Sequence, residues 1–190
     1  MERQLTALVE RPCKATFLAA RDAVLRLTAL PLSTSDFVLI ERLLERNEFA
    51  AVIERLDALP PSKVLSPRIH FFAAEAALEL GDHEQVELER SLFVIVLQGL
   101  LATGDGTRAN PYIVCHGSDE YDVLEAIGLE PAGQSLVEDA GRLCDVVTCA
   151  NGREVWFDVT DLIRRPSAAE KRGKTRPKAP RRVNVSRAQR

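Results

Sequence analysis

The sequence contains few of the residue patterns that define specialised protein classes. Its four cysteines are scattered, with no CxxC pair and without the density of a secreted disulfide scaffold. No apolar run reaches the roughly 20 residues that a membrane-spanning helix needs, and the N-terminal stretch lacks the apolar core of a secretory signal. We therefore expect a reduced, cytoplasmic protein without a transmembrane segment.

Known ligand-binding motifs are also missing. The stretch Gly104-Asp105-Gly106-Thr107 lacks the lysine of a P-loop and the spaced acidic ligands of an EF-hand. It also follows a predicted helix, whereas a phosphate site precedes one. A helix stop explains it better, because glycine accepts the left-handed conformation common at helix ends. No cysteine and histidine spacing is typical of zinc, so we predict neither a metal nor a cofactor. The residues considered for zinc are Cys115, His116, Cys144 and Cys149.

The most apolar stretch of the chain runs from Ser91 to Leu101. It is too short to cross a bilayer as a helix, and Gln98 and Gly99 interrupt it. A helix that is apolar on nearly every side has to be covered on nearly every side. We expect this helix to be buried at a junction between two bodies of structure. Its apolar residues are Leu92, Phe93, Val94, Ile95, Val96, Leu97, Leu100 and Leu101.

The first half of the chain has the periodicity of amphipathic helices in pairs. Apolar residues recur there at three- and four-residue spacing. Pro31 and the Pro60-Pro61 pair end two of the helices, and Ser35 and Asp36 can cap another. The predicted helices begin near residues 14, 36, 49, 67 and 83.

The helical pattern repeats along the chain with a constant offset. Asn47 and Gly81 occupy equivalent turns, and Val52 and Val86 occupy equivalent helix positions. The offset equals the period of the tetratricopeptide repeat, which is about 34 residues, and the small side chains near positions 73–77 suit the close helix packing of such a repeat. An ordinary helical bundle with a chance offset is the alternative.

The chain changes character after Gly106. A strand is predicted over 112–115 and a helix from a Ser118 cap to Gly128. Further strands are predicted near 134–137, 143–149 and 154–159, and Asn151-Gly152 is a strong hairpin signal between the last two.

Together these patterns predict an α+β protein. Antiparallel helical pairs, tetratricopeptide-like in character, pack on a small C-terminal α/β unit with a β-hairpin. The predicted domains are a helical-repeat region over 1–103, a small α/β domain over 104–163 and a disordered basic tail over 164–190.

A series of short motifs between residues 100 and 160 resembles a known family. In order, the motifs are Gly104-Asp105-Gly106, Pro111 to Val114, Ser118 to Tyr121, Gly128-Leu129, Gly133 to Val137, Cys144-Asp145-Val146 and Val155 to Val159. With this order the chain resembles a bacterial family of uncharacterised proteins, domain of unknown function 4919. The resemblance implies a fold, and it implies no activity and no catalytic residue. The basic tail lies outside it.

Four residues form the only candidate catalytic group. Cys115, His116, Asp119 and Glu120 lie where a predicted strand meets a predicted helix, a common ligand position in α/β proteins. Adjacent strand residues point to opposite faces, which argues against a Cys-His nucleophile pair. The structural alternative is a buried Cys115, a His116 at the rim and two carboxylates that complement a helix dipole.

The C-terminal tail has the opposite charge from the rest of the chain. Residues 1–163 carry 14 Lys and Arg against 27 Asp and Glu, a net charge of −13, and residues 164–190 carry 11 against one, or +10. The tail is a candidate to bind the phosphates of nucleic acid or another polyanion, and the alternative is a solvated extension. The candidate residues are Lys171, Arg172, Lys174, Arg176, Lys178, Arg181 and Arg182.

Two functional hypotheses follow. The first is a non-catalytic adaptor whose helical pairs bind another protein in a groove, with the tail as an anchor to a polyanion. The second is an enzyme of unspecified reaction with a site around His116.

Overall fold

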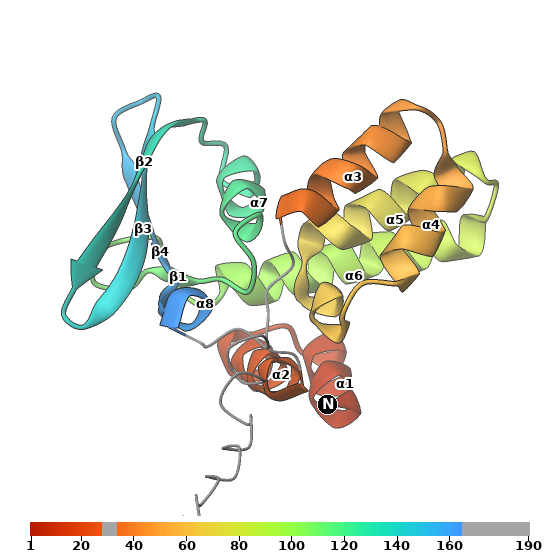
Figure 1. Cartoon of the computed structure of the whole chain (residues 1–190). Helices are drawn as coiled ribbons and strands as arrows, with labels where there is room; N and C mark the ends of the chain where they lie inside the picture. The colour runs from red at the N-terminus through yellow and green to blue at the C-terminus, as the bar shows by residue number, and fades with distance from the viewer. Residues whose placement is uncertain (28–33, 165–190) are drawn as a thin grey trace, which may run out of the picture.

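The protein has an α+β fold in which helices outnumber strands (Figure 1). The computed structural model describes residues 1–27 and 34–164. The predicted helix end at Pro31 and the tail from residue 165 onward lie outside these residues. The helices are α1 (Glu2–Glu10), α2 (Lys14–Leu27), α3 (Thr34–Glu45), α4 (Phe49–Asp57), the 3-10 helix η1 (Pro61–Leu65), α5 (Pro67–Glu79), α6 (His83–Leu101), α7 (Asp119–Ala126) and α8 (Thr160–Arg164). The strands are β1 (Tyr112–Ile113), β2 (Pro131–Asp139), β3 (Arg142–Cys149) and β4 (Glu154–Asp158).

The predicted repeat offset is confirmed in the helix turns. The end of α3 and the end of α5 are separated by the same number of residues as the start of α4 and the start of α6. Both turns contain the same backbone hydrogen bond, from Glu48 N–H to the Leu43 carbonyl and from Asp82 N–H to the Ala77 carbonyl, each 2.9 Å. The left-handed residue is Asn47 in the first turn (φ 57°) and Gly81 in the second (φ 78°). The turns of the pairs α3/α4 and α5/α6 therefore have the same local structure.

Helix α6 packs beside one apolar core and contributes residues to another. Its N-terminal half packs on α5, and its C-terminal half reaches the sheet and α1 and α2 (Figure 1). One core is formed by α3, α4 and α5, and the other joins α1, α2, the C-terminal half of α6, α7 and the sheet. The second core contains residues from both sides of the predicted domain boundary at residue 103. The boundary itself stays a prediction.

The expectation that this helix is covered on all sides is wrong. Val96 and Leu100 are buried, but Val94 is 48% exposed and Leu88 is 49% exposed. Only part of its circumference faces other elements, because α5 covers one side and α1 and α2 cover another.

Gly99 is the point of closest approach between α6 and the N-terminal helices. A Cβ atom at this position would lie 2.7 Å from Phe17 Cδ2 and 3.1 Å from Leu8 Cδ1. We expect Gly99→Val to destabilise the protein by about 1–3 kcal/mol, since overpacking a core costs this much. Urea denaturation measures the change. Gly133→Val is the control, because no atom lies within 4 Å of a Cβ there and we expect no loss; equal stability of the two variants would contradict the close packing.

The end of α6 differs from the predicted glycine stop. The helix ends at Leu101, and the capping residue Ala102 is right-handed. Gly104 is needed for another reason, because a Cβ atom there would lie 2.3 Å from the Pro111 carbonyl oxygen. Thr103 fixes the following segment, since its hydroxyl accepts a hydrogen bond from Ile113 N–H at 2.8 Å.

The four strands form one mixed sheet in the order β1-β4-β3-β2. The predicted hairpin at Asn151-Gly152 joins β3 to β4, and Gly152 has the expected positive φ of 82°. A second hairpin at Ala140-Gly141, which the sequence patterns did not predict, joins β2 to β3. The strand β1 lies parallel to β4 and covers two residues, fewer than the predicted 112–115.

Candidate functional site

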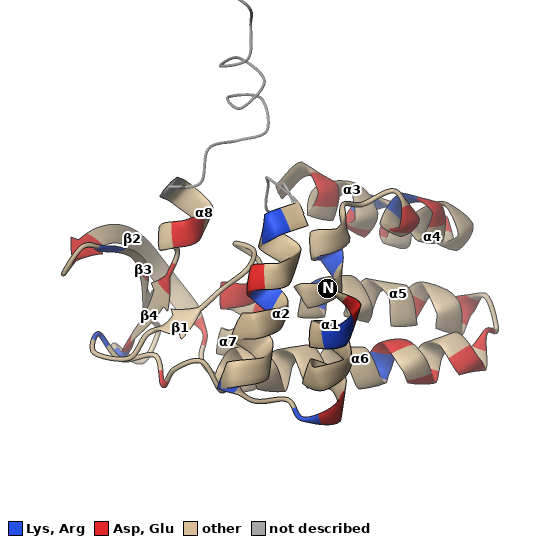
Figure 2. Ribbon diagram, turned by 90° about the horizontal axis from the view of Figure 1, so that it is seen from below, with Lys and Arg blue, Asp and Glu red and all other residues tan. Residues whose placement is uncertain are grey.

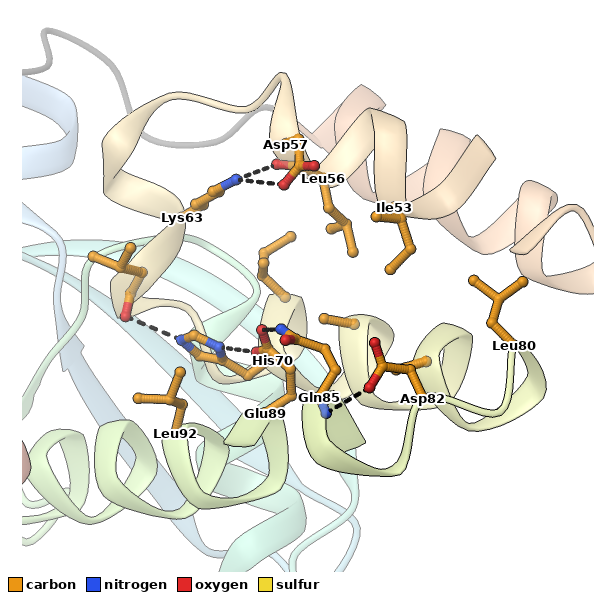
Figure 3. Close-up of a pocket in the computed structure, with 14 residues that line it drawn as sticks. Ile53, Leu56, Asp57, Lys63, His70, Leu80, Asp82, Gln85, Glu89 and Leu92 are labelled. Carbon is orange, nitrogen blue, oxygen red and sulfur yellow. Dashed lines mark hydrogen bonds and ion pairs between the residues drawn. The ribbon is translucent and has the colours of Figure 1, made fainter. Parts of the chain in front are cut away.

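The helical part of the protein contains a groove between α4, η1, α5 and α6. Its cavity volume is about 670 Å³, and Figure 3 shows side chains from all four elements converging on it. The lining residues are Ile53, Leu56, Asp57, Lys63, Val64, Ile69, His70, Ala73, Ala77, Leu80, Asp82, Gln85, Glu89 and Leu92.

The walls of the groove are apolar. Ile53 and Leu56 enter it from α4, and Ile69, Ala73 and Ala77 recur on α5 at intervals of four residues, which puts them on one face of that helix. The two alanines leave space between α4 and α6, because their side chains end at Cβ. The groove is therefore a product of small residues on α5.

One end of the groove carries a hydrogen-bonded polar group. His70 Nδ1 lies 2.6 Å from Glu89 Oε2, and His70 Nε2 lies 3.2 Å from the Val64 carbonyl oxygen. Gln85 Nε2 donates to Glu89 Oε1 at 2.8 Å (Figure 3). Both oxygens of Glu89 are thus occupied, and the group links η1, α5 and α6.

Charged residues lie along the remaining border. Lys63 Nζ donates to the Leu56 carbonyl at 2.6 Å and lies 3.8 Å from Asp57 Oδ1. Asp82 caps α6 by accepting a hydrogen bond from Gln85 N–H at 3.0 Å. The lining of the groove contains three carboxylates, from Asp57, Asp82 and Glu89, and one lysine. Apolar walls with an acidic border are suited to a peptide segment that carries apolar and basic side chains.

The sequence patterns placed no site residue in this groove. They indicated the small residues of α5 as packing residues. The groove depends on contacts between residues on different helices, such as His70 and Glu89, which local periodicity does not detect. The repeat period was the one available signal, because helix pairs of this kind enclose a concave face.

The residues of the predicted catalytic group meet in a buried turn. Asp119 Oδ2 accepts hydrogen bonds from the backbone N–H of Cys115 at 2.8 Å and of His116 at 2.9 Å. Because β1 ends at Ile113, Cys115 and His116 lie beyond the strand, and the argument from opposite strand faces does not apply to them. Asp119 therefore ties the turn that precedes α7, and it does not bind the start of that helix.

His116 is buried and does not lie at the rim, contrary to the structural alternative considered from sequence. It is 1% exposed, and its Nε2 donates to the Ser62 carbonyl at 3.0 Å. Burial lowers the pKa of His116 to about 4, so the ring is neutral at pH 7. Burial also raises the pKa of the Cys115 thiol, which keeps it protonated and a poor nucleophile.

The two carboxyl groups of the predicted catalytic group, Asp119 and Glu120, are also buried. Burial raises the pKa of Asp119 to about 8 and that of Glu120 to about 9. Glu120 shares a hydrogen bond with Asp145 on β3 and accepts one from Gln134 Nε2 at 3.1 Å. Ser118 stands directly before the helix as predicted, but its hydroxyl makes no capping bond. These residues connect α7 to η1 and the sheet, and none of the four lines the groove of Figure 3.

The remaining predicted site lies outside the described residues. It comprises Lys171, Arg172, Lys174, Arg176, Lys178, Arg181 and Arg182, and their binding to a polyanion stays a prediction. Figure 2 shows that acidic and basic residues are interspersed along the described helices. Among residues 1–27 and 34–164, no three or more His, Cys, Asp or Glu side chains are grouped so that they could hold a metal ion. Within the same residues no helix has the length and apolar character needed to cross a membrane.

Comparisons with known proteins give no match: no family model, no curated protein and no solved structure is similar to this chain.

Proposed function

We propose that the protein is a non-catalytic adaptor that binds a segment of another protein in the groove between α4, α5 and α6. The observation that carries the proposal is the groove itself, with apolar walls from α4 and α5 and a border that contains three carboxylates. The repeated turns at Asn47 and Gly81 support a tetratricopeptide-like reading of the two helix pairs. The resemblance to domain of unknown function 4919 is part of the same proposal.

The shape of the groove limits the kind of partner. A volume of about 670 Å³ is enough for a few side chains of a peptide and too small for a folded domain. Apolar side chains of the partner would contact Ile53, Leu80 and Leu92, which line the groove and are at least partly exposed. Basic side chains beside them would meet Asp57 and Asp82. A short amphipathic segment with Lys or Arg is therefore the partner that this groove fits.

Leu80 offers a way to test the groove without disturbing the core. It lines the groove and is 52% exposed, so a charge there leaves the folded state intact. We expect peptides selected from a random phage-displayed library on the wild-type protein to bind Leu80→Asp at least about tenfold more weakly, because an apolar contact becomes a charge. Titration of the selected peptides by fluorescence anisotropy measures the affinities.

Leu39→Asp is the matched control for this experiment. Leu39 is 41% exposed, lies on α3 and does not line the groove. Peptides should bind this variant as they bind the wild type. If no peptide is enriched, or if both variants lose binding equally, the groove is not the binding site.

A further inference from the structure

A second apolar surface lies on the side of α5 and α6 that faces away from α4. It forms a shallow groove of about 500 Å³. Phe71, Leu78 and Val94 are 48%, 45% and 48% exposed there. The Phe71 and Phe93 rings, one from each helix, lie 6.5 Å apart across it. We call this surface, formed by Phe71, Ala74, Leu78, Phe93 and Val94, the open strip.

The first helix pair indicates what kind of element the open strip can contact. Residues of α3 that correspond to it by the repeat offset are covered by α5. Phe37 is 8% exposed and its ring lies 6.5 Å from that of Phe72 on α5, and Ile40 is fully buried. A helix pair of this kind therefore receives the next helix on this face. The corresponding pairs are Phe37 and Phe71, Ile40 and Ala74, and Leu44 and Leu78.

Two charges on the open strip complement each other. Glu75 comes from α5 and Arg90 from α6, and both are exposed and line the shallow groove of the open strip. Arg90 takes the position that the buried Leu56 occupies in the first pair. Its neighbour Glu87, on its own helix, lies 3.7 Å away, and both side chains are exposed, so this pair contributes little.

We propose that the open strip binds a second copy of this chain through a two-fold interface. In a two-fold interface every contact between two different residues occurs twice, so Glu75 of each chain can meet Arg90 of its partner. The small Ala74 between Phe71 and Leu78 allows the two α5 helices to approach closely. A surface with only one sign of charge would repel its own copy, whereas this one carries one charge of each sign.

The small size of the open strip predicts a weak dimer. Interfaces below about 1,200 Å² are typical of transient complexes. The dimer should therefore form in the micromolar range and dissociate on dilution. The groove between α4 and α6 opens on the other side, so both copies would keep their peptide-binding site.

Sedimentation equilibrium of the full chain over a range of concentrations tests the dimer. We expect Glu75→Arg and Arg90→Glu each to weaken self-association at least about tenfold, because each creates two like-charge contacts. Mixing the two variants should restore association, since every contact then joins opposite charges. Glu79→Arg makes the same charge reversal on α5, but Glu79 does not line the shallow groove of the open strip. This variant should therefore dimerise like the wild type.

Two results would overturn the proposal. The first is a wild-type chain that stays monomeric up to about 1 mM, a concentration at which even weak contacts of about 4 kcal/mol are occupied. The second is a mixture of the two variants that associates no better than either alone. In both cases we would infer that the open strip binds a helix of a different protein.

Discussion

Leu100→Asp is expected to unfold the whole described chain in a single step. Leu100 is fully buried in the core that joins α1, α2, α6, α7 and the sheet. An unpaired charge in such a site, together with the lost apolar contacts, costs about 4 kcal/mol or more. This is a large part of the roughly 5–15 kcal/mol that stabilises a typical domain. Circular dichroism and tryptophan fluorescence during urea denaturation measure the loss.

The single tryptophan makes the coupling visible. Trp156 lies on β4, whereas the circular dichroism signal comes mostly from the helices. The two signals should change together in the wild type and shift together in the variant, since α6 packs on α5 and also contributes residues to the core that contains the sheet. Leu88→Asp, on the exposed side of the same helix, should lose no more than about 0.5 kcal/mol. Separate transitions for the two signals would show that the cores unfold independently.

Glu120→Gln is expected to stabilise the protein at alkaline pH. The pKa of Glu120 is about 9 in the folded state, raised by burial and then by Asp145, against an ordinary value of 4.5. A group with a raised folded pKa gives its full stabilisation below the unfolded pKa and loses it as pH rises through the folded one. The wild type should therefore lose stability from about pH 5 to pH 9. Glutamine keeps the hydrogen bonds and has no proton to lose.

The gain in the free energy of unfolding should grow with pH. It should rise by about 1.4 kcal/mol for each pH unit between 5 and 9, and reach several kcal/mol at the upper end. Urea denaturation at pH 5, 7 and 9 gives the values. Asp119 is unchanged in the variant, and its raised pKa leaves part of the pH dependence in place. Glu125→Gln is the control on the same helix, because that side chain is 79% exposed; a gain independent of pH would contradict the buried acid.

At acid pH the free energy of unfolding depends on a different group, the imidazole of His116. The pKa of His116 is lowered by burial to about 4, so its contribution is present above its ordinary value of 6.5 and is lost as pH falls toward 4. Asp119 and Glu120, whose pKa values are raised, lose their contribution to stability as the pH rises. Both effects come from one buried turn.

Local features of the fold could be predicted from the sequence. Prolines and the repeat offset indicated the helix pairs, because helix ends depend on a few neighbouring residues. Asn151-Gly152 indicated one hairpin for the same reason. The Ala140-Gly141 hairpin was not predicted, since alanine rarely takes a positive φ, here 49°.

Features that depend on distant contacts could not be predicted. The parallel pairing of β1 with β4 joins residues 112 and 157, and no local pattern indicates it. The burial of Asp119 and Glu120 was missed because acidic residues at a helix start are usually solvated. The groove and the open strip are both set by how α5 packs on its neighbours, which becomes known only when the neighbours are placed.

The hydrogen bonds of Arg21 determine when the N-terminal helices can complete their contacts. This buried residue of α2 donates to the Val114 carbonyl at 3.1 Å and to Asp161 at 2.7 Å. The ribosome makes α2 before these two partners of Arg21, which follow it by 93 and 140 residues. The contacts within the pairs α3/α4 and α5/α6 can form as soon as each pair is synthesised, since they are short-range in sequence. Among the described helices, α2 is thus made before α3 to α6 but is expected to complete its hydrogen bonds after them.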